Sequence, residues 1–168
     1  MLDTAPVVAT TPDFEAVFRD AFEPMVRALT VASGSRTVAE DCVQEAFSRA
    51  FVRWRRIGGY DDPAGWIRHV AVNVMRDHHR REQRKGRALT RLAARPDATT
   101  APSDPAGAGL GEMVAALPEQ QRIAASLFYV EQLSVRETAQ AMDLSEGAVK
   151  YHLHAARTSL RRAWEQPS

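Results

Sequence analysis

Two groups of polar side chains with opposite chemistry lie between Arg36 and Lys85. The first is acidic and amide-bearing, with Asp41, Gln44 and Glu45 spaced so that one edge of a helix can carry all three. The second follows directly and mixes arginines with tryptophans and a tyrosine. An acidic and amide edge suits a protein partner, although plain solvent exposure produces the same spacing. The basic and aromatic group suits a nucleic acid, because arginines hold phosphates and aromatic rings stack on bases.

The basic and aromatic group favours single-stranded or opened DNA over an intact duplex. Stacking on an aromatic side chain contributes about 1–3 kcal/mol per base, and it needs an unpaired base. Tyr60 is the strongest stacking candidate, because it lies in a loop beside Gly58 and Gly59. Trp54 and Trp66 are equally compatible with a place in the hydrophobic core. The arginines of this group are Arg53, Arg55, Arg56 and Arg68.

A second DNA-reading element is expected near the C-terminus, where a tight turn joins two helices. Ser134 and Glu137 have the spacing of a capping box, and Ser145 can cap the helix that follows. This arrangement is typical of a helix-turn-helix, whose second helix lies in the major groove; an ordinary helical hairpin is the alternative. In the groove, Lys150 would donate to guanine and Glu146 would accept from cytosine. The candidate base-reading residues are Ser145, Glu146, Gly147, Lys150, Tyr151 and His154, with Arg157, Arg161 and Arg162 facing phosphates.

Charge is distributed unevenly along the chain, although its 168 residues carry a formal net charge of only +1. Residues 1–48 hold 3 basic and 8 acidic side chains, residues 49–95 hold 13 and 4, and residues 96–168 hold 6 and 9. A basic block between two acidic flanks points to a polyanionic partner, or else to a solvated basic helix.

The apolar pattern predicts helices throughout, and hence an all-α fold. An amphipathic helix follows Asp13, and Pro24 is expected to bend it or make it restart near Glu23. The next helix is predicted to start near Thr37, with a capping box, and Pro63 to open a third. The apolar stripes of these three helices can bury one core together.

The predicted fold class is all-α, with two small helical domains joined by a flexible linker. Residues 13–85 form the N-terminal helical bundle, and residues 111–165 form the C-terminal helix-turn-helix domain. Residues 86–110 form the linker, whose later part is rich in proline, glycine and small residues and has few large apolar ones to build a core. Such a linker lets two domains engage separate sites on one DNA.

No pattern of residues predicts an enzyme, a metal site or a cofactor. The paired histidines are one or two positions apart on helices, so their side chains diverge, and there is no phosphate-binding or nucleophile motif. Cys42 is the only cysteine and is expected to be buried, in a reducing compartment. No apolar run approaches the length of a membrane span, and residues 1–12 lack a signal-peptide pattern. We therefore expect a cytoplasmic protein without membrane insertion.

Three stretches resemble the extracytoplasmic-function sigma factors of bacterial RNA polymerase, the smallest members of the sigma-70 family. Residues 39–47, with the sequence AEDCVQEAF, are similar to the family's region 2.2. Residues 66–77 are similar to region 2.4, and residues 117–160 to region 4. The resemblance covers residues 13–164, and the combination is far more specific than either half.

The resemblance implies a transcription initiation factor that chooses promoters and opens their strands, while the polymerase carries out the chemistry. Its implied partners are core RNA polymerase, promoter DNA and, as in many family members, an anti-sigma factor. The implied core-polymerase contacts are Asp41, Gln44, Glu45, Phe47 and Arg49. The implied −10 element contacts are Arg53, Arg55, Arg56, Tyr60, Trp66, Arg68, Asn73, Arg76, Asp77 and Arg80. The implied −35 element contacts are Ser145, Glu146, Gly147, Lys150, Tyr151, His154 and Arg157.

Two departures from the family pattern lie in the helix-turn-helix. Asp143 stands where glycine is usual, and aspartate tolerates the left-handed geometry of a tight turn. Tyr151 and His152 stand where Ser and Arg are frequent, so the −35 sequence itself is not predicted. Two rival functions are a helix-turn-helix repressor or activator and a helical adaptor that binds another protein. Neither rival needs an acidic edge followed by a basic and aromatic loop, which favours the sigma factor.

Overall fold

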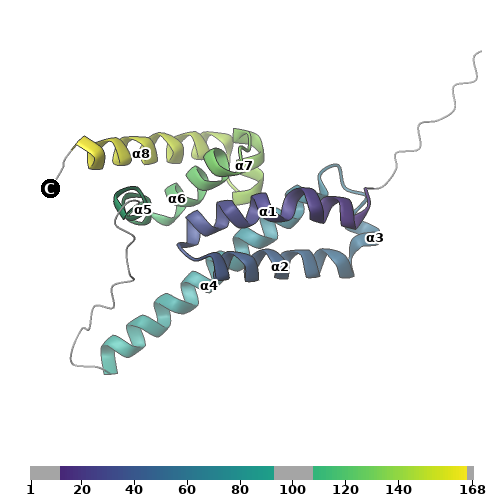
Figure 1. Cartoon of the computed structure of the whole chain (residues 1–168), viewed down its shortest axis with the longest axis horizontal. Coiled ribbons are helices and arrows are strands. Elements are labelled where there is room, and N and C mark those ends of the chain that lie inside the picture. The colour runs from purple at the N-terminus through teal and green to yellow at the C-terminus, as the bar shows by residue number, and fades with distance from the viewer. Residues whose placement is uncertain (1–11, 93–107, 166–168) are drawn as a thin grey trace, which may run out of the picture.

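The computed structural model describes residues 12–92 and 108–165. No strand occurs within these two ranges, which confirms the all-α prediction (Figure 1). None of their helices combines the length and the apolar character that a membrane crossing needs. The elements are α1 Phe14–Ser33, α2 Arg36–Val52, α3 Trp54–Ile57, α4 Pro63–Leu92, α5 Ala108–Ala115, α6 Glu119–Ala125, the π-helical turn η1 Ser126–Val130, α7 Val135–Met142 and α8 Glu146–Glu165.

Capping side chains account for the starts of three helices. Ser134 Oγ accepts the amide of Glu137 at 3.1 Å, and Glu137 Oε2 accepts the amide of Ser134 at 2.7 Å, so the predicted capping box of α7 is present. Ser145 accepts an amide three residues further on at 3.1 Å and so caps α8 as predicted. Asp62 does the same for α4, at 2.8 Å.

Helix α2 starts earlier than the sequence predicted. Its cap is Ser35, whose Oγ accepts the amide of Val38 at 3.3 Å, rather than Thr37. The glutamate that the prediction assigned to a capping box, Glu40, is instead held by the Nε of Arg36 at 2.7 Å. The first turn of α2 is therefore stabilised by the Ser35 cap and by the ion pair between Arg36 and Glu40.

Helix α1 runs through Pro24 without the restart that the sequence allowed. The residues that follow it, Met25, Val26, Ala28 and Leu29, are at most 2% exposed and belong to the core. Proline removes one hydrogen bond from the helix, but burial of this apolar face outweighs that loss, because tertiary packing supplies most helical stability in proteins.

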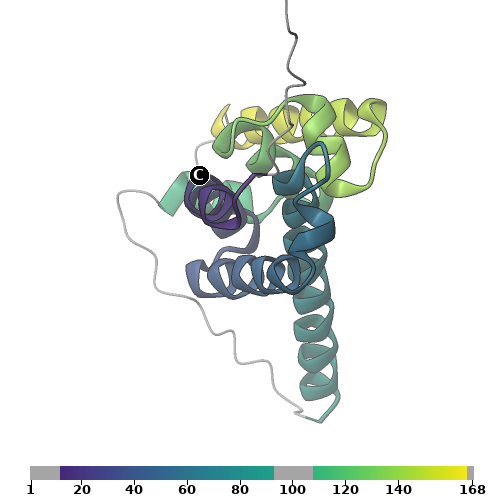
Figure 2. The ribbon, with the colours of Figure 1, turned by 90° about the vertical axis from the view of Figure 1, so that its right-hand side faces the viewer.

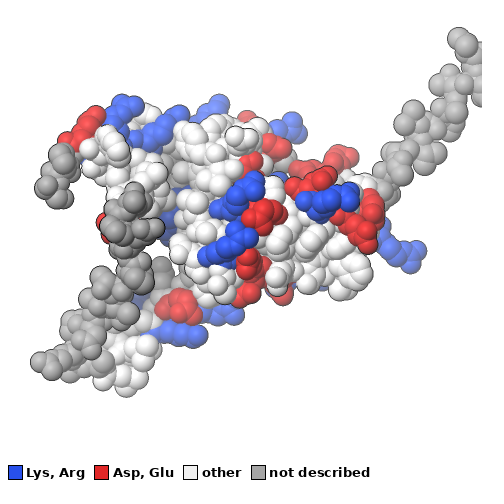
Figure 3. All heavy atoms as spheres, in the orientation of Figure 1, with Lys and Arg blue, Asp and Glu red and all other residues white. Residues whose placement is uncertain are grey.

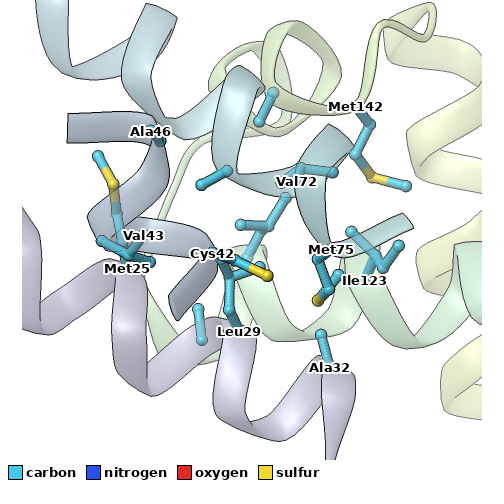
Figure 4. Close-up of a cluster of buried hydrophobic side chains, with 14 of the residues drawn as sticks. Met25, Leu29, Ala32, Cys42, Val43, Ala46, Val72, Met75, Ile123 and Met142 are labelled. Carbon is cyan, nitrogen blue, oxygen red and sulfur yellow. The ribbon is translucent and has the colours of Figure 1, made fainter. Parts of the chain in front are cut away.

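One hydrophobic core extends through both halves of the chain, which lie side by side (Figure 2). Figure 4 shows Cys42 and Met75 from the N-terminal half in the same cluster as Ile123 and Met142 from the C-terminal half. All four side chains are at most 3% exposed. The sequence predicted a core confined to the N-terminal helices, whereas the folded chain joins it to the core of the helix-turn-helix.

Helix α4 is longer than the sequence suggested. It has 30 residues, which corresponds to about 45 Å at 1.5 Å per residue. Its last turns extend away from the other helices (Figures 1 and 2), and residues 80–92 are exposed throughout. Residues 86–92, which the sequence interpretation placed in the linker, are helical.

Cys42 is expected to react slowly with thiol reagents in the folded chain. It is 3% exposed, and burial, followed by the charge of Asp41, raises the pKa of its thiol to about 11. Because the thiolate is the reactive form, we expect alkylation near neutral pH to be about a hundredfold slower than in denaturant. Time courses with iodoacetamide, followed by mass spectrometry, would measure this ratio; equal rates would show that Cys42 is accessible.

Candidate nucleic-acid interface

The acidic and amide residues lie on one exposed side of α2, here called the acidic face: Asp41, Gln44, Glu45 and Arg49. Their spacing of three or four places them on successive turns. Arg49 Nε donates to Glu45 Oε1 at 2.8 Å. Phe47 was predicted as a fifth contact residue, but its side chain is only 2% exposed. It therefore supports the acidic face from beneath.

An apolar groove borders the acidic face, and sequence reasoning missed it. Phe14 and Phe18 of α1 line it, together with Gln44, Phe51 and Val52 of α2. Phe51 is 66% and Val52 is 83% exposed, and contiguous exposed apolar side chains of this size mark interaction sites. Phe51 lies four residues after Phe47, on the same side of α2, so the sequence alone does not distinguish this exposed position from a core position.

The basic and aromatic loop divides into core and surface residues. Trp54 begins α3 and packs edge-on against Phe14, with ring centroids 5.1 Å apart, so it serves the core. Tyr60 is 36% exposed in the loop before α4, where an unpaired base can reach its ring. The arginines within residues 53–56 are exposed as well. The geometry thus keeps Tyr60 as the stacking candidate and removes Trp54.

The middle of α4, which was predicted to read DNA, is covered by the C-terminal half. Arg68 Nε donates to Glu131 Oε1 at 2.7 Å, and the two side chains are 10% and 3% exposed. Arg76 donates to the carbonyl oxygen of Met142 at 3.2 Å and to Gln120 Oε1 at 2.8 Å. These contacts join α4 to α6, to α7 and to the residue that follows η1.

Two histidines extend the same contact. His69 Nδ1 lies 3.2 Å from the carbonyl oxygen of Ala141, and its Nε2 lies 3.0 Å from Asn73 Nδ2. His79 Nδ1 lies 3.1 Å from Glu119 Oε1. We call this packing of the two halves the closed arrangement, and the side of α4 within it the covered face. The covered face consists of Arg68, His69, Asn73 and Arg76.

Burial disfavours the charged forms of Arg76 on the covered face and of Glu131 packed against it. It raises the pKa of Glu131, although the charge of Arg68 beside it acts in the opposite direction. Burial also lowers the pKa of Arg76. Glu131 Oε2 and Arg76 Nε are buried and have no hydrogen-bond partner among the described residues. A buried ion pair offsets its desolvation only with good geometry and further hydrogen bonds, so the shared apolar core supplies most of the stability of the closed arrangement.

The ten residues predicted to open and read DNA therefore fall into two groups. The exposed group is Arg53, Arg55, Arg56, Tyr60, Asp77 and Arg80. The buried or half-buried group is Trp66, Arg68, Asn73 and Arg76. The closed arrangement presents the first group to solvent and withholds the second.

Helix α8, by contrast, exposes every residue of its predicted DNA-reading face. Val149, Leu153 and Ala156 are at most 3% exposed and fix the helix on the core. Asp143 has φ 54°, so aspartate makes the left-handed turn as expected. Basic side chains lie along this edge of the molecule in Figure 3. The exposed candidates are Ser145, Glu146, Gly147, Lys150, Tyr151, His154 and Arg157.

Comparison with known protein families finds matches to two segments of the chain. Residues 20–85 match the family description "Sigma-70 region 2", and residues 108–160 match "Sigma-70, region 4". The RNA polymerase sigma-E factor of Streptomyces coelicolor is 29% identical over 151 residues, which cover 89% of this chain and 84% of that protein. The ECF RNA polymerase sigma factor BldN of the same organism is 30% identical over 139 residues, or 77% of this chain and 52% of that protein.

A solved structure shares the fold. It is the sigma factor RpoE in complex with the anti-sigma factor NepR from Bartonella quintana, with a TM-score of 0.73. The match covers 93% of this chain and 99% of that one at 17% identity. At that identity the likeness concerns the arrangement of helices.

Proposed function

The chain belongs to the sigma-70 family, as an extracytoplasmic-function sigma factor of RNA polymerase, and we propose which of its surfaces carry that role. A sigma factor binds core RNA polymerase and promoter DNA and directs transcription initiation. It therefore needs a surface for the polymerase, a reader for the −10 element and a reader for the −35 element. The described residues offer a candidate for each, and none of the three has to make or break a bond.

The exposed face of α8 is the observation that carries the assignment of the −35 reader. Lys150, His154 and Arg157 are four and three residues apart, so they share one side of the helix. Lys150 lies in the first turns, where a recognition helix meets base edges, and its ammonium can donate to guanine. Arg157 Nη1 donates to the hydroxyl of Tyr129 at 3.4 Å, further along, where phosphate is the expected target.

We assign core-polymerase binding to the acidic face together with the apolar groove beside it. Asp41, Gln44 and Glu45 offer acceptors and an amide, while Phe51 and Val52 offer exposed apolar surface directly alongside. Interfaces combine an apolar anchor with a polar rim in this way. The groove thus supplies an apolar contact beside the acidic face, for which the sequence indicated only polar and charged residues.

Reading the −10 element requires the covered face of α4 as well as the exposed loop with Tyr60. We therefore propose that the closed arrangement opens when the chain joins the polymerase. Residues 93–107 connect α4 to α5, and fully extended they span at most about 50 Å, which permits the separation. We propose that the sequence-predicted domains, residues 13–85 and 111–165, act as the two separable readers.

Two further assignments follow from the same proposal. The chain is placed in the cytoplasm, because the polymerase it serves is there. The sigma factor RpoE in the solved structure is bound to an anti-sigma factor, and we propose a partner of that class for this chain. Such a partner would hold the chain in the closed arrangement.

Substitutions on α8 test the proposed function. Lys150→Ala and Tyr151→Ala are each expected to lower transcription from a −35-dependent promoter about tenfold, because one good base contact is worth about 1–3 kcal/mol of discrimination. Run-off transcription with purified core polymerase on a genomic promoter library measures this and identifies the promoter. Glu165→Ala, at the exposed far end of the same helix, is the matched control and should be silent.

Binding measurements separate this proposal from its rivals. Both α8 variants should still bind core polymerase. Loss of that binding would show that α8 contacts the polymerase, which contradicts the assignment of that contact to the acidic face. The purified chain should bind promoter duplex weakly without polymerase. Tight and specific gel shifts by the chain alone would indicate a repressor or activator instead.

A further inference from the structure

The free end of α4 carries a single stripe of arginines, here called the arginine stripe: Arg80, Arg84, Arg87 and Arg91. Their spacing of four, three and four keeps them on one side of the helix over three turns. All four are exposed, as is every other residue from 80 to 92. The stripe continues the line of Asn73 and Arg76 on the covered face, so one side of α4 is polar or basic over most of its length.

The composition of residues 80–92 sets this helix end apart from an ordinary solvated one. It holds six basic side chains and one acidic, a net charge of +5. Within the described residues, Arg84, Arg87 and Arg91 take part in no hydrogen bond or ion pair through their guanidinium groups, while Arg80 reaches Asp77 at 3.2 Å. Like charges four residues apart destabilise a helix, and Gly86 lowers its propensity. A polyanion along the stripe would remove the repulsion.

The same residues indicate which polyanion fits. Residues 80–92 contain no aromatic side chain, so they offer no platform on which an unpaired base could stack. Arginines without such a platform contact phosphates, which position a protein on DNA irrespective of sequence. From Arg80 to Arg91 the helix rises by about 17 Å, which matches the phosphates of about five base pairs along one strand.

We propose that the arginine stripe holds the phosphates of double-stranded promoter DNA next to the −10 element, on the side toward the −35 element. The direction follows from the chain, because α4 leads through residues 93–107 to the half that carries α8. The inference rests on the proposed function and adds a contact to it. The loop with Tyr60 and the covered face serve opened strands, whereas the stripe serves the duplex beside them.

The test uses holoenzyme assembled from core polymerase and the full chain. Arg87→Gln with Arg91→Gln removes the two stripe arginines furthest from the acidic face. Arg19→Gln with Arg27→Gln, two exposed arginines of α1, is the control with the same change in net charge. Promoter affinity is measured as a function of salt concentration, on duplexes with a normal spacer and on duplexes with neutral methylphosphonate linkages in it.

The stripe variant is expected to lower the slope of log affinity against log salt by about 2, since each lost phosphate contact contributes about 0.9. The control should keep the wild-type slope. Neutral linkages should weaken the wild-type holoenzyme and should not weaken the stripe variant further. The inference would be overturned if the stripe variant kept the wild-type salt slope. It would also be overturned if the losses of affinity caused by the variant and by the neutral linkages added independently.

Two other results have different meanings. If the stripe variant loses as much affinity for a single-stranded −10 oligonucleotide as for the full duplex, the contact is with opened DNA and the inference is wrong. If wild-type holoenzyme starts no transcript on any promoter, the proposed function itself fails. A wild-type holoenzyme that initiates normally, beside a stripe variant with an unchanged salt slope, overturns the inference alone.

Discussion

An Arg68→Ala variant is expected to destabilise the closed arrangement by about 3–5 kcal/mol, the usual cost of leaving one member of a buried ion pair without its partner. Glu131, which is 3% exposed, would then lie in the interface with no opposite charge beside it. Opening the two halves lets water reach that carboxylate, so the expected result is a more extended chain. Small-angle scattering reports the radius of gyration, and thermal unfolding reports the accompanying loss of stability.

The matched control replaces both partners. Arg68→Met with Glu131→Leu removes the two charges together, and apolar replacements of a buried pair are close to neutral or stabilising. This double variant should stay compact, whereas Arg68→Ala should not. A single variant as compact and as stable as the wild type would show that the ion pair does not hold the halves together.

The pH dependence of this variant has a defined sign. Burial raises the pKa of Glu131 in the closed arrangement, so the closed form takes up a proton more readily than the open one. The stability of the closed form therefore increases as the pH falls through the raised pKa. It reaches its full value below the pKa that Glu131 has in the open form, and it is lost again as the pH rises through the raised pKa. Without Arg68 the carboxylate is harder to keep charged, so the destabilisation should be largest near neutral pH and shrink under acid conditions.

Charge reversal on the acidic face is expected to weaken core-polymerase binding about a hundredfold. Truncating one charge of a buried interfacial pair costs about 2–5 kcal/mol, and reversal adds repulsion to that loss. Asp41→Lys with Glu45→Lys changes two exposed residues of α2, one of which would also face Arg49 as a like charge. Fluorescence anisotropy of a labelled chain titrated with core polymerase measures the affinity directly.

The control for this reversal is Asp20→Lys with Glu165→Lys, two exposed acidic residues outside that face. It produces the same change in net charge and should leave the affinity within a few-fold of the wild type. Both variants should keep the helical content of the parent chain. Unaltered binding by the acidic-face variant would place the polymerase contact elsewhere on the molecule.

Local signals in the sequence predicted local structure well. The capping box of Ser134 and Glu137 lies within one helical turn, so its two hydrogen bonds could be anticipated from spacing alone. The same holds for Ser145 at the start of α8 and for Asp143 in the tight turn. The exposed face of α8 could be predicted because apolar and polar positions alternate with helical period, which indicates which side is buried.

Most of the misses share a physical cause, because they depend on residues far apart in sequence. Arg68 and Glu131 are separated by 63 positions, and nothing in the sequence around either residue indicates that they meet. Phe47 and Phe51 lie on one apolar stripe, yet packing against α1 buries the first and leaves the second 66% exposed. The core around Pro24 keeps α1 continuous. The start of α2 is a local miss instead, because Ser35 caps the helix two residues before the predicted Thr37.

The closed arrangement also lowers the fraction of molecules in which the covered face of α4 is accessible. A surface present in only a fraction of molecules has an apparent dissociation constant larger by the inverse of that fraction, so one open molecule in about a hundred weakens binding about a hundredfold. This factor applies to any ligand of the covered face of α4, while α8 keeps its intrinsic affinity in either form. A small molecule or peptide that bridges α4 and α6 would stabilise the closed form and so lower the fraction of open molecules. It would thereby inhibit transcription initiation without binding to the acidic face or to α8.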